Sequence, residues 1–592
     1  MFQTFTSTTR PDTCAPRVAA LRAAMAEAGV DAFLVPRADA HQGETVSPRD
    51  ARLQWIASFT GSAGFAVITA TRAALFVDGR YTLQAATQSD TTVFEMRNIP
   101  GDALSEWLSE ALPEGGTVAY DPWLHTPAEI ERLESASLAL APIANLIDSI
   151  WADQPAASSA PVINHPESLA GEGRQAKRAR IVEALTARGA SATVLTQPDA
   201  IAWLLNIRGS DIERTPVALG FAILEASGAV RLYGFDGKLD AAMVTALGSD
   251  VTMGDELLVD VAALTGKVCL ARETVPIAIA SAVTATLDWH DLIALPKARK
   301  TPEELAGTRA AHVRDGAAMV RFLHWLDEIA PIRTLTEIDV VTALEAERRR
   351  DPALRDISFE TICGAGPNGA IVHYRVTEET NRAVIPGELL LVDSGGQYED
   401  GTTDITRTIL VGDGPAPDGA AEAFTRVLQG MIAISMARWP KGLAGRDLDP
   451  LARAALWRAG QDYAHGTGHG VGAYLGVHEG PQRLSRVSHV PLEPGMILSN
   501  EPGYYREGAF GIRIENLVIV EATSTPVGGD HPMHAFETIT LAPIDRRLIV
   551  PSLLISEERD WLDAYHARVL DTLTPHLERA PLDWLKTACQ PL

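Results

Sequence analysis

Five side chains between residues 393 and 515 are metal donors, and four of them are carboxylates. They are Asp393, Asp404, His469, Glu501 and Glu515. Carboxylates about 4 Å apart repel one another by roughly 4 kcal/mol at an intermediate dielectric, so a site that gathers them needs positive charge. Two divalent cations would neutralise four carboxylates, and a water molecule bridging them becomes a hydroxide nucleophile near neutral pH. These residues therefore predict a dinuclear metallohydrolase.

The same charge balance suggests a role for Arg513. With two dications and one hydroxide, the four carboxylates leave a net charge of about −1, which one arginine would cancel. Arg513 precedes Glu515 by two residues in a strand-like run, and residues i and i+2 of a strand share a face. We expect its guanidinium to lie beside the metal ligands.

Two hairpins are predicted to present the carboxylates in pairs. The strand-like runs that carry Asp393 and Asp404 flank an Asp-Gly pair at 400–401, which is a hairpin signal that places the two aspartates roughly opposite each other. A second hairpin would pair Glu501 with Glu515 in the same way. Each hairpin then contributes one pair of carboxylates to one face.

The segment 465–472, His-Gly-Thr-Gly-His-Gly-Val-Gly, supplies the nitrogen donor His469. Two histidines four residues apart are typical of a zincin helix, but the glutamate of that motif is absent. Four alternating glycines also oppose a helix, because each costs ~1 kcal/mol relative to alanine. We expect extended backbone in which the glycines let substrate approach closely.

A Gly-x-Gly-x-x-Gly pattern at 364–369 matches the letters of a dinucleotide-binding loop. That loop must open a helix, whereas residues 370–375 read as a strand. We therefore do not expect a nucleotide site here.

Nine short motifs resemble those of the pita-bread metallopeptidases, and most closely the long, three-domain cytosolic form of the aminopeptidase P (Xaa-Pro aminopeptidase) family. They lie at 366–374, 392–398, 400–408, 465–472, 501–505 and 508–516, with 39–42, 61–64 and 78–81 further upstream. The resemblance covers most of the chain. It implies that the five donors bind two metal ions, usually manganese in this family.

The resemblance also implies roles for residues around the metals. Glu501 would double as the general base. His465, His478 and His373 would hold substrate and stabilise the tetrahedral intermediate, with Tyr505 as a further substrate contact. Oxygen-rich ligation without cysteine agrees with manganese, but zinc or cobalt would bind such donors more tightly, so the metal stays open.

The reaction implied is release of the N-terminal residue from peptides with proline in the second position, by attack of the bridging hydroxide. Proline lacks an N–H and fixes φ near −65°, so a pocket shaped for its ring, including His373, can select it. The residues leave two alternative functions open. A prolidase, which cleaves dipeptides, shares the five donors, as does methionine aminopeptidase. A metal-free pita-bread scaffold that binds peptides is disfavoured because all five donors are present.

Linker-like stretches at 153–161 and 296–302 divide the chain into domains 1–155, 156–300 and 301–592. The fold class expected is α/β (α+β). Alternating helix and strand patterns indicate α/β layers in the first two domains, and the resemblance implies two creatinase-type N-terminal domains. A pita-bread metallopeptidase domain with a C-terminal helical extension would follow.

The first two domains read as diverged copies, because Trp55 and Trp203 each begin a similar six-residue span after a helix-then-strand pattern. Chance similarity in Ala/Leu-rich sequence is the alternative. Arg80 could contact the far end of a bound peptide, or it could form a structural salt bridge. Near the C-terminus, Tyr565 and Trp584 indicate core packing, with contact in a homodimer as the alternative that the resemblance implies.

Composition narrows the partners and the compartment. A net charge of −25 and a pI near 5.0 disfavour nucleic acid and anionic membrane as partners. Four widely spaced cysteines form no CxxC pair, which fits a reducing compartment. Neither a signal peptide nor an apolar run of membrane-spanning length is apparent, so we expect a cytoplasmic protein.

Overall fold

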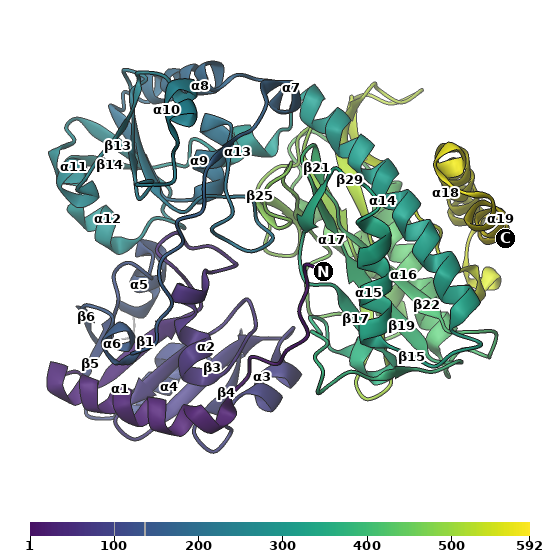
Figure 1. Cartoon of the computed structure of the whole chain (residues 1–592), viewed down its shortest axis with the longest axis horizontal. Coiled ribbons are helices and arrows are strands. Elements are labelled where there is room, and N and C mark those ends of the chain that lie inside the picture. The colour runs from purple at the N-terminus through teal and green to yellow at the C-terminus, as the bar shows by residue number, and fades with distance from the viewer. Residues whose placement is uncertain (100, 135–137) are drawn as a thin grey trace. The chain divides into compact units, whose positions relative to one another are not determined.

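The computed structural model describes residues 1–99, 101–134 and 138–592, and the chain forms two compact units (Figure 1). The N-terminal unit comprises Thr8–Glu167 and Glu172–Lys297, and the C-terminal unit comprises Met1–Ser7, Ser168–Gly171 and Ala298–Leu592. The boundary expected at 155 falls inside the N-terminal unit. The division into three domains therefore stays a prediction.

The N-terminal unit contains two six-stranded mixed sheets, ordered β4-β3-β2-β1-β5-β6 and β12-β11-β10-β8-β13-β14. Strand β1 pairs antiparallel with β2 and parallel with β5, and β8 pairs with β10 and β13 in the same two directions. The bounds are β1 Ala32–Pro36, β2 Phe65–Thr69, β3 Ala73–Asp78, β4 Glu95–Ile99, β5 Thr117–Tyr120, β6 Ala139–Pro142, β8 Ala192–Leu195, β10 Phe221–Glu225, β11 Val230–Tyr233, β12 Val251–Met253, β13 Lys267–Leu270 and β14 Thr286–Trp289.

These two sheets share one topology, because every strand of the first has a counterpart of the same order and direction in the second. A helix follows the first strand in both copies. It is α2 (Arg52–Ala57) in the first copy and α9 (Pro198–Leu205) in the second, and Trp55 and Trp203 lie on these helices. The expectation of two diverged copies is confirmed.

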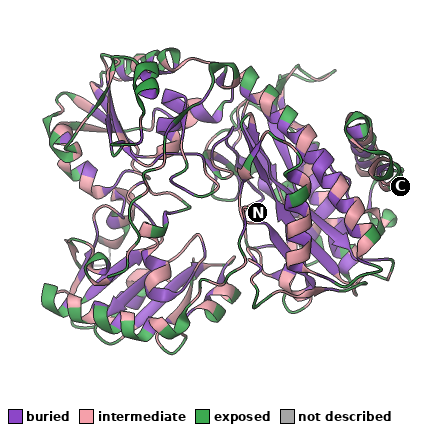
Figure 2. Cartoon of the chain, in the orientation of Figure 1, coloured by how far each residue is buried: buried purple, intermediate pink, exposed green. Residues whose placement is uncertain are grey.

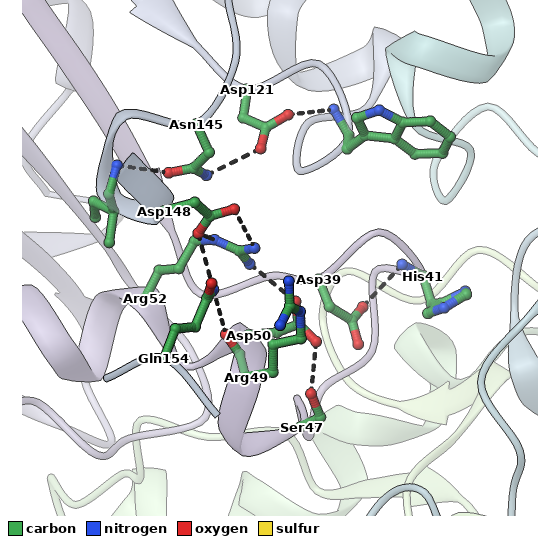
Figure 3. Close-up of polar contacts among 12 residues, drawn as sticks. Asp39, His41, Ser47, Arg49, Asp50, Arg52, Asp121, Asn145, Asp148 and Gln154 are labelled. Carbon is green, nitrogen blue, oxygen red and sulfur yellow. Dashed lines mark hydrogen bonds and ion pairs between the residues drawn. The ribbon is translucent and has the colours of Figure 1, made fainter. Parts of the chain in front are cut away.

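The motif at 39–42 forms a structural turn after β1 (Figure 3). Asp39 is buried, and its Oδ1 accepts the main-chain N–H groups of His41 at 2.9 Å and Gly43 at 3.0 Å. Where this loop ends, at the first residue of α2, Arg52 binds both carboxylate oxygens of Asp148 on α6 (Leu146–Ile150), at 2.7 and 2.9 Å. Hydrogen bonds thus tie this loop to a distant part of the same unit.

The C-terminal unit is built on two antiparallel sheets, β17-β19-β22 and β23-β30-β29-β26-β24-β25. Every residue of β19, β22, β26 and β28 is buried, and Figure 2 shows the exposed residues on the surrounding helices and loops. The bounds are β17 Ile362–Ala365, β19 Leu389–Ser394, β20 Gly396–Tyr398, β21 Gly401–Thr402, β22 Ile405–Leu410, β23 Arg438–Pro440, β24 Gly468–Gly470, β25 Glu479–Leu484, β26 Ile497–Asn500, β27 Gly503–Arg506, β28 Phe510–Arg513, β29 Asn516–Thr523 and β30 Met533–Thr538.

Long helices pack on these sheets and on one another. They are α14 Pro302–Ile329, α15 Glu337–Arg348, α16 Ala420–Ser435, α17 Gly445–Arg458, α18 Ser556–Leu573 and α19 Arg579–Ala588. The first of them begins with a capping box, in which Thr301 Oγ1 accepts the N–H of Glu304 at 3.1 Å and Glu304 Oε2 accepts the N–H of Thr301 at 2.9 Å. The sequence predicted this capping box because it involves only two residues, three positions apart.

The last two helices form the expected C-terminal helical extension. Tyr565 on α18 is 4% exposed and belongs to the core, and Trp584 on α19 packs against it. The core-packing interpretation of these aromatic residues is therefore confirmed.

Two further observations concern the cysteines and the lengths of the apolar helices. All four cysteines are buried and carry free thiols. Within the described parts of the chain, no helix combines the length and the apolar character needed to cross a membrane.

A buried ion pair supports the hairpin between β19 and β22. Arg348 of α15 is 1% exposed and binds Asp315 of α14 through Nε at 2.8 Å and Nη2 at 3.2 Å. The hydroxyl of Tyr398, at the end of β20, donates to the same carboxylate at 2.9 Å. Arg348 also donates to the carbonyl of Ser394 at 3.4 Å. The pair therefore anchors both ends of the strand segment that follows Asp393.

Replacing Arg348 by methionine should lower the free energy of unfolding of the C-terminal unit by about 3–5 kcal/mol, because Asp315 would stay buried without its partner. Urea unfolding followed by tryptophan fluorescence measures the loss. The double variant Arg348→Met with Asp315→Asn should recover part of it. If both variants are equally unstable, the unpaired carboxylate is not the cause.

Candidate metal centre

The hairpin β19–β22 brings the two predicted aspartates to one face. Asp393 pairs with Thr406, and continuing the register one step past β22 puts Asp404 opposite Gly395. The aspartates are therefore diagonal neighbours, two residues from direct opposition, where the sequence predicted that they lie roughly opposite each other. Because residues i and i+2 share a face, both carboxylates still point the same way.

A second hairpin presents the two glutamates. Strands β26 and β29 end at the pair Asn500–Asn516, so the next step of the same register places Glu501 opposite Glu515. The pairing resumes beyond them between β27 and β28, where Gly503 faces Arg513. The glutamates thus occupy a gap between two ladders, where their side chains are free to converge.

His469 lies on β24, next to both hairpins. Its Nε2 is 3.5 Å from Asp404 Oδ2 and 3.5 Å from Glu501 Oε1. Its Nδ1 lies 3.0 Å from the carbonyl oxygen of Gly470, which leaves Nε2 as the ligand atom. Donor atoms of Asp404, His469 and Glu515 lie within 4.8 Å of one another, close enough to hold one ion.

The glycines around His469 are needed by the neighbouring strands. The segment is extended, as predicted, but a Cβ on Gly468 would lie 1.9 Å from the carbonyl oxygen of Ser499, and one on Gly470 would lie 2.2 Å from that of Glu479. The geometry thus supplies another reason for these two glycines, and close approach of substrate stays a prediction. Side chains here would push β24 away from the strands that fix its position.

The acid cluster is buried, and its pKa values respond to that burial. Burial raises the pKa of Asp404, and although contact with His469 lowers it, the neighbouring carboxylates leave it at about 6. Burial raises the pKa of Glu515 well above its ordinary value, and Asp404 is the neighbour that adds most. Burial alone would lower the pKa of His469, but Asp404 and Glu501 raise it to about 9. These carboxylates therefore resist ionisation until cations arrive.

The donors fit a pair of divalent cations. Asp393 Oδ1 and Asp404 Oδ1 are buried and make no hydrogen bond with the described protein atoms, which is costly unless another partner is intended. Four carboxylates and one imidazole are the hard and borderline donors of manganese, cobalt and zinc sites. The five predicted donors are thus gathered at one site.

Arg513 lies beside the cluster, as its position in the strand predicted. It is 2% exposed, and Nη2 contacts Asp393 Oδ2 at 2.5 Å. Nη1 donates to the hydroxyl of Tyr505 at 2.7 Å, and Nε donates to Thr406 Oγ1 at 3.2 Å. Its charge is therefore applied directly to one of the metal donors.

The three outer histidines differ in how firmly they are held. His465 Nε2 lies 2.9 Å from the hydroxyl of Tyr505, which links it to Arg513. The ring of His478 packs edge-on against His469, with centroids 4.1 Å apart. His373 is half-buried in the loop after the 3-10 helix Gly366–Ala370.

The loop that carries His373 corrects one expectation. Residues 370–375 are not a strand, as the sequence suggested; a 3-10 turn ends there and irregular backbone follows. Tyr374 instead donates from its hydroxyl to the buried carboxylate of Glu337 at 2.9 Å. Asn368 binds the same carboxylate, so a side chain network replaces ladder bonds here.

Arg80 lies in the N-terminal unit and forms a salt bridge. Its Nη2 binds Asp78 Oδ2 at 2.7 Å, and its guanidinium covers the ring of Tyr81 at 5.2 Å. The structural alternative for Arg80 is thus present, and contact with a substrate stays a prediction.

Two hydroxyl side chains that touch the metal donors were missed. Thr406 Oγ1 donates to Glu515 Oε2 at 2.8 Å, and Ser499 Oγ donates to Glu501 Oε1 at 3.2 Å. Thr406 lies two residues after Asp404 and Ser499 two residues before Glu501, so the two-residue strand period would have found both.

Comparison with known proteins shows which family this chain matches. Residues 306–522 match the model of metallopeptidase family M24, and residues 532–592 match the C-terminal region of peptidase M24. Residues 17–150 and 153–304 each match the creatinase/prolidase N-terminal domain. Over 97% of its length the chain is 40% identical to a probable Xaa-Pro aminopeptidase P of Neosartorya fischeri, covering 92% of that protein. The chain belongs to metallopeptidase family M24.

Other relatives are similar to this chain over nearly its whole length. A probable Xaa-Pro aminopeptidase P of Aspergillus niger is 39% identical over 97% of this chain and 98% of its own. The crystal structure of X-prolyl aminopeptidase from Caenorhabditis elegans, described as a cytosolic enzyme with a di-nuclear active site, matches with a TM-score of 0.93. It is 33% identical, and the match covers 98% of this chain and 100% of that one. The predicted family and the predicted creatinase-type and pita-bread folds are confirmed.

The pKa values predict how the metal-free protein responds to pH. For Asp404 the folded value of about 6 exceeds the ordinary 3.8, and for His469 about 9 exceeds 6.5. Both groups bind protons more tightly in the folded protein than in the unfolded chain. Their contributions to the free energy of unfolding are therefore fully present below their ordinary pKa values and are lost as the pH rises through their folded pKa values. We expect the melting temperature of chelator-treated protein to fall between about pH 4 and pH 9.

The variant Asp404→Asn is the control for that pH titration. It should remove the part of the fall between about pH 4 and pH 6. It should also move the upper part of the fall to lower pH, because the hydrogen bond to Asp404 is the largest of the interactions that raise the pKa of His469. Parallel curves for the variant and the unmodified protein would contradict the assignment.

Proposed function

We propose that this chain is a metal-dependent aminopeptidase that releases the N-terminal residue from peptides with proline in the second position. The observation that carries the proposal is the convergence of four carboxylates and His469 in one buried site. It occurs in a chain that is 40% identical, over nearly its whole length, to a probable Xaa-Pro aminopeptidase P. A metal-free peptide-binding scaffold would have no need of such a cluster, because it would retain the repulsion without the cations.

Two divalent cations are proposed to sit among Asp393, Asp404, His469, Glu501 and Glu515. When bound, they supply a water nucleophile that is ionised near neutral pH and they polarise the scissile carbonyl. Manganese is the metal proposed, with zinc or cobalt as substitutes. The oxygen-rich donor set suits manganese, although zinc and cobalt bind such donors more tightly.

Glu501 is proposed as the general base. One of its oxygens, Oε1, accepts from Ser499 Oγ at 3.2 Å and faces His469 Nε2 at 3.5 Å, which fixes the orientation of the carboxylate. The carboxylate would take the proton of the attacking water and give it to the leaving proline nitrogen. That nitrogen needs a proton because it leaves as a secondary amine.

His465, His478 and His373 are proposed to bind the substrate and the charge that develops on its carbonyl oxygen. His465 is positioned by Tyr505, whose own hydroxyl is held by Arg513. Burial raises the pKa of Tyr505 to about 12, so its hydroxyl stays protonated and can donate to a ligand or to His465. His373 is proposed to line the pocket that selects the proline ring, which presents no N–H to be read.

Further proposals rest on the family and on the sequence. The chain is proposed to act in the cytoplasm, as the Caenorhabditis elegans enzyme does, and to form a homodimer. The division into domains 1–155, 156–300 and 301–592 and a substrate contact by Arg80 are also proposals.

Reaction class and substrate length can be tested together. A chelator should abolish release of arginine from the peptide Arg-Pro-Pro, and Mn²⁺ should restore it. The peptide Arg-Ala-Pro should be a much poorer substrate, because an alanine side chain cannot fill a pocket shaped for the proline ring. Undiminished activity in excess chelator would contradict the proposal, and cleavage of Arg-Pro but not Arg-Pro-Pro would identify a prolidase.

The role of Glu501 can be tested with Glu501→Gln, which keeps the size of the side chain but removes the proton acceptor. We expect kcat to fall about 10²- to 10⁴-fold, as is typical for a lost general base. Elemental analysis of the purified variant separates this loss from loss of metal. Glu507→Gln, on the exposed turn of the hairpin β27–β28, is the matched control and should keep full activity. A metal-loaded Glu501→Gln with unchanged kcat would assign the base elsewhere.

A further inference from the structure

Arg407 is a buried arginine that pairs with no carboxylate among the residues that the structure describes. It is 2% exposed, and its six acceptors are all uncharged oxygens. They are the carbonyls of Thr406, Glu515, Ala542 and Pro543, the side-chain oxygen of Asn516 and the hydroxyl of Tyr565. Burying an arginine without a counter-charge is costly, so its contacts need an explanation beyond stability.

The contacts of Arg407 gather around one metal donor. Nη1 donates to the carbonyl oxygen of Glu515 at 2.6 Å, and Nη2 donates to Oδ1 of the next residue, Asn516, at 2.9 Å. Arg407 itself follows Asp404 by three residues and lies within β22. One guanidinium therefore joins the backbone of Glu515 to the strand that follows Asp404.

This guanidinium is in turn oriented by the C-terminal extension. The hydroxyl of Tyr565, on α18, accepts from Arg407 Nη2 at 3.0 Å. The same hydroxyl lies 2.8 Å from the carbonyl oxygen of Ala542 and can donate its own proton there. Tyr565 is 4% exposed and its ring stacks on Trp561 with centroids 5.3 Å apart, so the hydroxyl has little freedom to move.

We propose that Arg407, oriented by Tyr565 of the C-terminal extension, is a positioning residue that holds Glu515 for metal binding. The inference rests on the proposed metal centre and deepens it, because it gives the extension a function at the site. The guanidinium donates to the main-chain carbonyl of Glu515, while Thr406 Oγ1 donates to the carboxylate of the same residue at 2.8 Å. Fixing both leaves the donor little to reorganise when a cation binds.

The contacts that lead from Tyr565 through Arg407 to Glu515 are called the relay below. The variant Tyr565→Phe tests the relay with the smallest change, since it removes only the hydroxyl. Metal-free protein is titrated with Mn²⁺ in a calorimeter, and the dissociation constant is measured without reference to activity. We expect it to rise about tenfold, the lower end of what the loss of a partner behind a metal ligand usually costs. Arg407→Lys keeps the charge but cannot span six acceptors, and it should raise the constant further.

His566→Leu is the matched control. His566 is the next residue of α18, is equally buried, and its Nε2 accepts the N–H of Ile544 at 3.0 Å. The control therefore also removes one buried hydrogen bond between α18 and the segment before it, but it leaves Arg407 with all its partners. It should lower the melting temperature of metal-free protein about as much as Tyr565→Phe does and leave the Mn²⁺ dissociation constant within about twofold.

Equal Mn²⁺ dissociation constants for Tyr565→Phe and His566→Leu would overturn the relay. If Arg407→Lys does not fold, the comparison of these two variants decides alone. Unmodified protein that binds no Mn²⁺ would overturn the metal centre itself, and the relay with it.

Discussion

Four carboxylates in one buried site repel one another, and the C-terminal unit is arranged around that repulsion. Burial, together with the neighbouring carboxylates, raises the pKa values of Asp404 and Glu515 in the metal-free protein. Arg513 relieves part of the repulsion by direct contact with Asp393, but one positive charge cannot balance four negative ones. Divalent cations complete the balance, so the property that makes the site costly to fold is also the one that makes it bind metal.

Rigid β-structure is what keeps such a cluster together. Two antiparallel hairpins, each supplying one pair of carboxylates, set the spacing through their registers. The glycines beside His469 let β24 pack close to its neighbours. The donors lose little entropy when a cation arrives, because their backbone is already held. Asp393 and His469 lie on strands, and the N–H groups of Glu501 and Glu515 donate to the carbonyls of Thr467 at 2.8 Å and Thr406 at 3.2 Å. The hydroxyls of Thr406 and Ser499 then restrict the carboxylates that the strands present.

Two buried arginines of the C-terminal unit, Arg348 and Arg407, support this centre. In the C-terminal unit, the Arg348–Asp315 pair anchors the hairpin beyond Asp393, and Arg407 joins the extension to Glu515. In the N-terminal unit, two copies of one mixed-sheet fold contain none of the metal donors. The chemistry is thus confined to one unit.

The sequence by itself determined the donor set, the family, the two hairpins and the capping box at Thr301. Those features depend on residue type, on two-residue strand periodicity and on interactions between near neighbours. Only the tertiary structure decided the diagonal register of Asp393 and Asp404, the irregular loop at 370–375 and the partners of Arg407. A register depends on the bulges and packing of whole sheets, and Arg407 meets Tyr565 from 158 residues away. Local spacing carries no information about contacts made at such separations, because they are selected by the packing of the complete core.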